Sequence, residues 1–180
     1  MPSPAASAAT VRTALRRFRR NRRGSVAVEF ALVAPVFFAL LFAIIETAIV
    51  FMAGQVLQSV ATEAARTILT GQAQNAGYSQ AQFQSTVVCP LIPALFTCAN
   101  LYIDVESASS FTGFTLNNEV VGGVFQGTNM LYNPGGPGDV VIVRLFYQWP
   151  LFVTGFGYNI ANLSNGKRQL TATVAFRNEP

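Results

Sequence analysis

The amino-acid sequence predicts an α+β fold in which a long N-terminal transmembrane helix extends into an outer domain with a small antiparallel sheet. Three observations predict this fold. A nearly uncharged apolar run covers residues 25–53, an amphipathic helical stripe follows it, and strand-like segments come late in the chain and in series. We expect four segments: a basic leader (1–24), a transmembrane helix (25–53), an amphipathic extension of that helix (54–70) and an outer α+β domain (71–180).

The leader holds most of the positive charge of the chain. Seven of the 12 basic residues lie among the first 23 residues, which contain no acid. From residue 24 onward five basic residues stand against eight acidic ones, so the net charge of +4 belongs to the leader. An arginine-rich tail is compatible with nucleic-acid binding, but this charge distribution does not predict a basic folded domain. We therefore expect no nucleic-acid partner.

The apolar run is long enough to cross a membrane. Sixteen uncharged residues separate Glu29 from Glu46, and a helix over residues 25–46 covers roughly 32 Å, about the thickness of the bilayer hydrocarbon core. Pro35 is compatible with a membrane helix, because neighbouring groups satisfy the carbonyl that it frees. The alternatives are a fully buried core helix, a secretory signal peptide and, for residues 1–24, a mitochondrial transit peptide.

Arginine side chains at one end of this run predict its orientation. The six nearest to the run are Arg16, Arg17, Arg19, Arg20, Arg22 and Arg23. The positive-inside rule places this end in the cytoplasm and the chain after about residue 54 outside it. We also expect these side chains to contact the anionic headgroups of membrane lipids.

The apolar positions become periodic beyond the span. They form a stripe at helical spacing, which comprises Val56, Leu57, Val60, Ala61, Ala64, Ala65, Ile68 and Leu69. The helix is therefore expected to continue to about residue 70 and to end at Gly71. A polar loop (71–82) should then lead into a short helix around residues 79–89.

Three segments of the outer domain read as strands. Aliphatic and other residues alternate over 101–106 and 169–177, which predicts half-buried strands, whereas 139–147 is apolar on both faces and predicts a central strand. Residues 133–139 and 164–167 predict turns. Asp104 and Glu106 share one face of the first strand, and we expect that face to be solvated. Residues 107–132 give no clear pattern.

Cys89 and Cys98 are the two cysteines of the chain. Their spacing and their expected location outside the membrane favour a disulfide, with two buried free thiols as the alternative. A metal site is not expected, because the sequence has no His and no further Cys.

The sequence also lacks several catalytic signatures. Without His, no Ser-His-Asp or Cys-His nucleophile system can form. No nucleotide-binding or hydrolase motif is present either. We expect neither an enzyme nor a bound cofactor.

A short motif stands between the leader and the apolar core. Residues 22–30, RRGSVAVEF, place a Gly after basic residues and a Glu five positions after that Gly. This segment resembles the processing site of type IV prepilins and pseudopilins, and most closely the TadE-like family of the tight-adherence (Flp) pilus system. The resemblance extends through Pro35, Glu46 and the Ala-rich residues 61–66, and it is plausible again in the cysteine pair and in residues 177–180.

The resemblance implies a processing event and a pilin-like fold. A prepilin peptidase would cut between Gly24 and Ser25, and Glu29 and Phe30 would take part in assembly and register. The implied protein is a minor pseudopilin of Flp pilus assembly in the bacterial inner membrane. Its implied partners are the prepilin peptidase, other pilins and pseudopilins, and the inner-membrane assembly platform.

Two questions stay open at this point. The Glu29 carboxylate either pairs with the new amine at Ser25 of a neighbouring subunit or reaches the cytoplasmic headgroups near Arg22 and Arg23. The chain as a whole is either processed, or it is a permanently anchored single-pass protein whose outer domain binds an envelope partner or ligand.

Overall fold

The computed structural model describes residues 24–155 and 157–180, and these residues form an α+β fold with one long N-terminal helix and small antiparallel sheets. The fold class predicted from the sequence is thereby confirmed. The chain divides into two compact units, an N-terminal unit (residues 1–43) and a C-terminal unit (residues 44–180).

Helix α2 spans Ser25–Leu69 and contributes to both units. It contains Pro35, and it ends at Leu69, close to the end that Gly71 predicts from the sequence. Gly71 has a positive φ of 72°, and its N–H donates to the carbonyl of Ile68. This left-handed residue turns the chain away from the helix axis at low cost, because Gly has no Cβ.

The second half of α2 presents an apolar stripe to the core of the C-terminal unit. Its buried members are Val50, Ala53, Leu57, Val60, Ala61, Ala64, Ala65 and Ile68. Four of these eight residues are Ala, whose small side chains let a helix approach a sheet closely. The amphipathic stripe predicted from the sequence is therefore the face that packs.

Short helical segments follow α2. They are α3 (Gln72–Asn75), α4 (Gln80–Phe83), the π-helical segment η2 (Gln84–Val88), α5 (Cys89–Leu91) and the 3-10 segment η3 (Cys98–Asn100). Ser79 caps α4 in a reciprocal arrangement with Gln82, which satisfies two backbone N–H groups at the start of the helix. The short helix predicted around residues 79–89 is thus present as consecutive helical turns.

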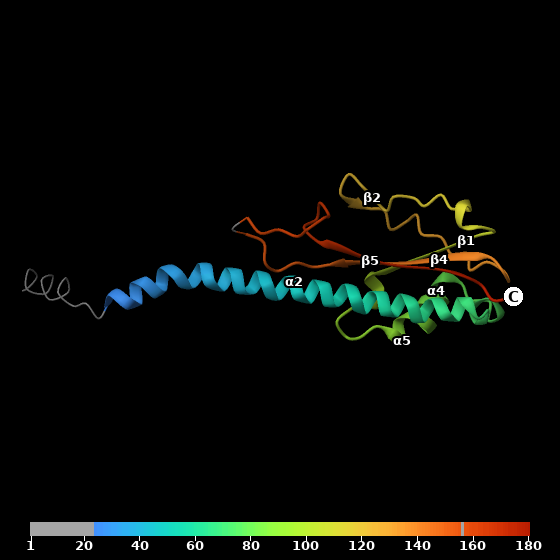
Figure 1. Ribbon diagram of the computed structural model, residues 1–180, viewed down its shortest axis with the longest axis horizontal. Helices are drawn as coiled ribbons and strands as arrows, with labels where there is room; N and C mark the ends of the chain where they lie inside the picture. Colours follow the sequence, from blue (N-terminus) through green and yellow to red (C-terminus); the bar gives the residue numbers. More distant parts are fainter. Residues whose placement is uncertain (1–23, 156) are drawn as a thin grey trace, which may run out of the picture. The chain divides into compact units, whose positions relative to one another are not determined.

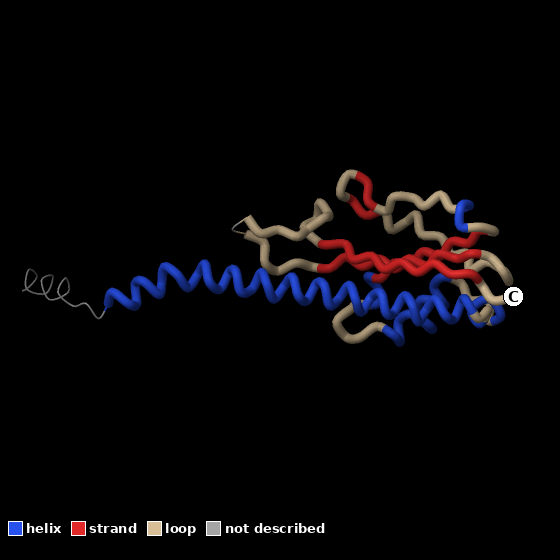
Figure 2. Tube along the Cα trace, viewed as in Figure 1, coloured by secondary structure: helices blue, strands red, loops and turns tan. Residues whose placement is uncertain are grey.

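The main sheet contains β1 (Leu101–Ala108), β4 (Val140–Trp149) and β5 (Arg168–Arg177) in the order β1-β4-β5. Both pairings are antiparallel, and β4 is the central strand. Figure 2 shows these three strands running side by side. A central strand is buried on both faces, which explains why the sequence of β4 is apolar except at Arg144 and Gln148.

The two faces of this sheet have different covers. Alternate residues such as Ile103, Leu145 and Ala172 point into the core that includes the stripe of α2. The opposite face lies under the segment between β1 and β4, which contains η4 (Phe111–Gly113) and a hairpin of β2 (Val120–Val121) with β3 (Val124–Phe125). Figure 1 shows this segment on the side of the sheet away from the second half of α2.

One side chain of α2 completes the hydrogen bonding of the outer strand. The Gln58 amide nitrogen donates to the carbonyl of Thr173 at 3.1 Å, and the Gln58 amide oxygen accepts from the N–H of Thr173 at 3.3 Å. Gln58 therefore occupies the place that a residue of a further strand would take beside β5.

Candidate functional site

The predicted cleavage position lies where α2 begins. Gly24 and Ser25 are both exposed, and the helix starts at Ser25. A Cβ built on Gly24 meets no other atom within 4 Å. The peptide bond that joins the two residues therefore lies at an accessible helix terminus.

Glu29 lies one helical turn after this position. The Ser25 hydroxyl donates to the Glu29 carboxylate at 3.1 Å, so the carboxylate reaches back to residue 25 of its own helix. The N-terminal end of a helix carries partial positive charge and stabilises a carboxylate there. Glu29 can thus interact with residue 25 before any processing takes place. The neighbouring Phe30 is 68% exposed.

The first half of α2 is apolar and exposed. Its exposed large side chains are Val26, Val28, Phe30, Leu32, Val33, Val36, Phe37, Phe38, Leu40, Leu41 and Phe42. Within the part of the chain that the structure describes, α2 is the one helix long and apolar enough to cross a membrane, and none of its most apolar stretch is buried inside the protein. These observations argue against a buried core helix and fit a single-pass membrane anchor.

The predicted topology signal lies outside the described residues. This applies to Arg16, Arg17, Arg19, Arg20, Arg22 and Arg23, for which the charge pattern of the sequence is the only basis.

Glu46 ends the apolar run, and the fold holds its carboxylate. The residue is only 5% exposed. Its carboxylate accepts from the N–H of Phe152 at 2.5 Å and from the N–H of Val153 at 3.1 Å. From the sequence alone, the position of Glu46 at the far end of the apolar run predicts an interfacial carboxylate that reaches water. The structure differs because a segment 106 residues further along the chain supplies the donors.

A buried ionic cluster joins β1, β4 and the segment between them. Arg144 binds Asp104 through Nη2 at 2.6 Å and through Nε at 2.9 Å, and it also binds Glu106 at 2.9 Å and Glu119 at 2.6 Å. Asp104 is 1% exposed. Burial, followed by the charge of Asp104, raises the pKa of the Glu106 carboxyl above its usual value.

This cluster corrects the expectation of a solvated strand face. The structure shows Asp104 and Glu106 covered, because the segment with β2 and β3 lies over them and Glu119 reaches Arg144. The signal that sequence reasoning missed is Arg144 itself, the single charged residue in the predominantly apolar central strand. Such a residue is almost never buried without a carboxylate partner.

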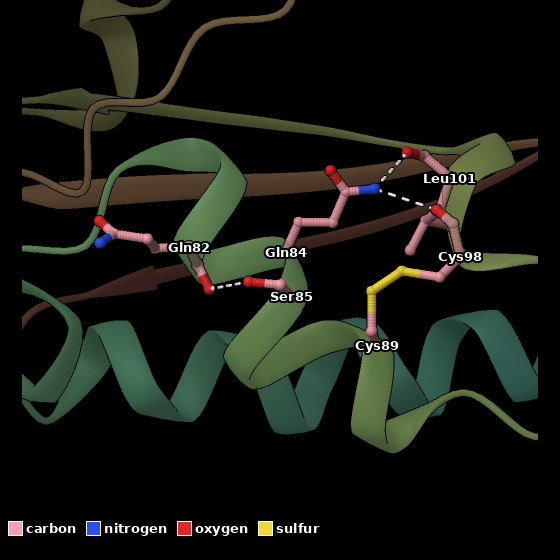
Figure 3. Close-up of a disulfide and its surroundings, with 6 residues drawn as sticks. All are labelled: Gln82, Gln84, Ser85, Cys89, Cys98 and Leu101. Atoms are coloured by element: carbon pink, nitrogen blue, oxygen red, sulfur yellow. Dashed lines mark hydrogen bonds between the residues drawn. A yellow bond between two sulfur atoms is a disulfide. The ribbon is translucent and has the colours of Figure 1, made fainter.

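Cys89 and Cys98 form a disulfide, as predicted, with their Cα atoms 5.6 Å apart. Figure 3 shows Gln84 beside it, and its side-chain amide donates to the carbonyls of Cys98 and Leu101 at 3.0 Å each. The closed loop carries Phe96, whose ring packs edge-on against Tyr147 at a centroid distance of 4.9 Å. The disulfide therefore holds an aromatic side chain of this loop in the core of the C-terminal unit.

Within the described residues, no group of three or more His, Cys, Asp or Glu side chains is arranged to hold a metal ion. The acidic cluster around Arg144 instead has a guanidinium at its centre.

Residues 24–66 match the protein-family model described as TadE-like protein. No curated protein and no solved structure matches the chain. The family match confirms, over residues 24–66, the resemblance seen in the sequence. It begins at Gly24 and covers most of α2, whereas the sheet and the disulfide lie beyond it.

Proposed function

We propose that this chain is a minor pseudopilin-like subunit that takes part in the assembly of Flp/Tad-type pili after processing by a prepilin peptidase. One observation carries the proposal: α2 starts immediately after an exposed Gly24, with Glu29 facing residue 25, inside the region that matches the TadE-like family. The role is structural, so no catalytic residue is assigned.

The proposed cleavage separates Gly24 from Ser25. It removes all seven leader arginines and creates an α-amino group on Ser25. The mature chain then has five basic and eight acidic side chains. The basic leader thus serves orientation and processing, and the assembled form is net acidic.

The proposed topology has the leader in the cytoplasm and the C-terminal unit outside the bacterial inner membrane. The positive-inside rule supports this orientation. The disulfide between Cys89 and Cys98 supports it as well, because such bonds persist in oxidising compartments outside the cytoplasm. Membrane lipids surround the first half of α2 until assembly.

The proposed role of Glu29 follows from the new amine. In a bundle of such helices, the Ser25 amine of one subunit and the Glu29 carboxylate of its neighbour neutralise each other and set the axial register, with Phe30 packing beside them. Other pilins, pseudopilins and the inner-membrane assembly platform are the proposed partners. Within one helix the Ser25 hydroxyl already donates to the Glu29 carboxylate, which supports the choice of residue 25 as its partner.

A second candidate function is a permanently anchored single-pass protein whose outer domain binds an envelope partner. The same hydrogen bond favours this candidate, because the uncleaved chain already provides a donor to Glu29. N-terminal sequencing of the mature protein separates the two functions. A start at Ser25 supports processing, and an intact Met1 in cells with an active prepilin peptidase supports the permanent anchor.

A Gly24→Val variant tests the cleavage position with a matched control. Side chains at Gly24 and at Gly54 both extend into open space, so neither Gly24→Val nor Gly54→Val creates a clash at Cβ. We expect Gly24→Val to accumulate uncleaved and Gly54→Val to be cleaved like the wild type. Equal cleavage of both variants would contradict the assignment of Gly24.

A further inference from the structure

The loop after β4 carries the most exposed large apolar side chain of the C-terminal unit. Phe152 is 83% exposed, ahead of Phe51 at 70% among the described residues of that unit. A single exposed apolar side chain needs no explanation, whereas several that lie together mark a contact with another apolar surface.

This loop is attached to the end of the apolar run. The N–H groups of Phe152 and Val153 donate to the Glu46 carboxylate. The Tyr158 hydroxyl lies 2.5 Å from the Thr47 hydroxyl. Glu46 and Thr47 lie at the C-terminal end of the uncharged stretch that begins after Glu29. Phe152 is therefore held at the level of α2 where a membrane span would meet water.

The composition of the loop suits a membrane interface. Residues 145–166 contain no Asp, Glu, Lys or Arg. On α2 itself, Phe51 and Met52 are also exposed, only a few residues beyond Glu46. Apolar side chains therefore surround this end of the span on the helix and on the loop.

Part of the loop backbone is already hydrogen-bonded within the protein. Polar backbone groups at membrane depth are costly unless the protein satisfies them. Besides the two amides bound to Glu46, the N–H and carbonyl groups of Gly155 and Tyr158 bond to each other at 3.2 and 2.8 Å. These four N–H groups thus need no water.

We propose that the loop segment 151–155 inserts into the lipid headgroup and acyl boundary next to the end of α2, with Phe152 as the inserted side chain and Glu46 as the anchor of the loop. This inference rests on the membrane anchoring in the proposed function. It adds a second membrane contact, which fixes the C-terminal unit against the bilayer surface. Because the loop is uncharged, its insertion is independent of anionic lipid and of salt.

Hydroxyl-radical footprinting of the wild-type chain tests this proposal. The full chain is reconstituted at one copy per phosphatidylcholine nanodisc, and the oxidation of individual phenylalanines is measured by mass spectrometry. Phe111 is the matched water-exposed control, because it is 65% exposed and lies in η4, at the other end of the sheet in Figure 1. Phe38, in the first half of α2, is the control for lipid contact.

We expect Phe152 to be oxidised several-fold more slowly than Phe111 and at a rate close to that of Phe38. Oxidation of Phe152 as fast as Phe111, with Phe38 protected, would overturn the loop insertion and leave the membrane anchor intact. Oxidation of Phe38 as fast as Phe111 would overturn the anchor and the insertion together. Protection of Phe152 that arises only with several copies per nanodisc would mean that a second copy covers it, which also overturns the lipid contact.

A substitution provides an independent readout. Phe152→Ser removes the inserted ring without changing the hydrogen bonds of the loop backbone to Glu46. We expect faster hydrogen exchange over residues 151–155 in nanodiscs and unchanged exchange over β4. Exchange equal to the wild type in both regions would contradict the insertion.

Discussion

Glu29 and Glu46 lie at the two ends of the apolar run, and their environments differ. Glu29 is exposed and accepts a hydrogen bond from Ser25, in its own helix. Glu46 is buried and accepts from the amides of Phe152 and Val153, more than 100 residues away. The difference shows that the C-terminal unit holds Glu46 by long-range contacts, whereas Glu29 in the first half of α2 stays at the surface, where another molecule can reach it.

Among the substitutions that test this difference, removal of Arg144 should cause the largest loss of stability. Arg144→Ala leaves three carboxylates together in a buried site, and breaking such a cluster costs about 3–5 kcal/mol. Denaturant unfolding in detergent micelles measures the loss. Arg66→Ala is the control, because its pair with Glu63 is exposed and should contribute almost nothing. Equal stability of both variants would contradict a structural role for the cluster.

Removal of the Glu46 carboxylate should have the next largest effect. Glu46→Ala leaves the amides of Phe152 and Val153 without their acceptor, which costs about 1–3 kcal/mol per buried unpaired group. We expect lower stability together with new protease cleavage between residues 150 and 160. Glu46→Gln keeps one acceptor oxygen and should lie between Glu46→Ala and the wild type. Resistance of the loop in Glu46→Ala would show that other contacts hold it.

The acidic cluster also predicts a pH dependence. The pKa of Glu106 is raised from 4.5 in the folded state, so the folded protein binds this proton more tightly than the unfolded chain does. Its contribution is therefore fully present below pH 4.5 and falls as the pH rises through the folded pKa. Asp104, Glu119 and Arg144 face this carboxyl. Relative to Glu106→Gln, the wild type should lose stability as the pH rises above 4.5 in denaturant titrations, and the opposite slope would contradict this prediction.

Removal of the Glu29 carboxylate should have the smallest effect on stability. Glu29→Ala deletes an exposed group whose partner lies in the same helix, so the unfolding midpoint should equal that of the wild type. Under the proposed function, cleavage should stay intact while recovery of assembled pili falls, as immunoblotting of sheared filaments would show. Normal pilus assembly in this variant would indicate that Glu29 only reaches the headgroups.

Local patterns were enough to predict the elements of this fold. The helical spacing of apolar residues predicted the packing stripe of α2, and Gly71 predicted its end. Alternation predicted β1 and β5, and a segment apolar on both faces predicted the central strand β4, each within a few residues. These features depend on nearest neighbours in the chain, and a sequence displays such neighbours directly.

The environment of the charges could not be predicted in the same way. Asp104 looked solvated because the segment that covers it, around β2 and β3, has no periodic signal of its own. Glu46 looked interfacial because its donors lie in a loop after β4. These contacts join segments that lie far apart in the sequence, so the spacing of residues within one segment does not predict them.

The pairing of Gln58 with Thr173 has a consequence for how copies of this chain meet. An outer strand with unpaired backbone groups invites the strand of another molecule, which leads to uncontrolled aggregation. Here the Gln58 side-chain amide of α2 already binds both the N–H and the carbonyl of Thr173, in the middle of the β5 edge. A foreign strand would have to displace this side chain before it could extend the sheet. The Gln58 contact therefore blocks one position at which β5 could extend the sheet into a neighbouring copy.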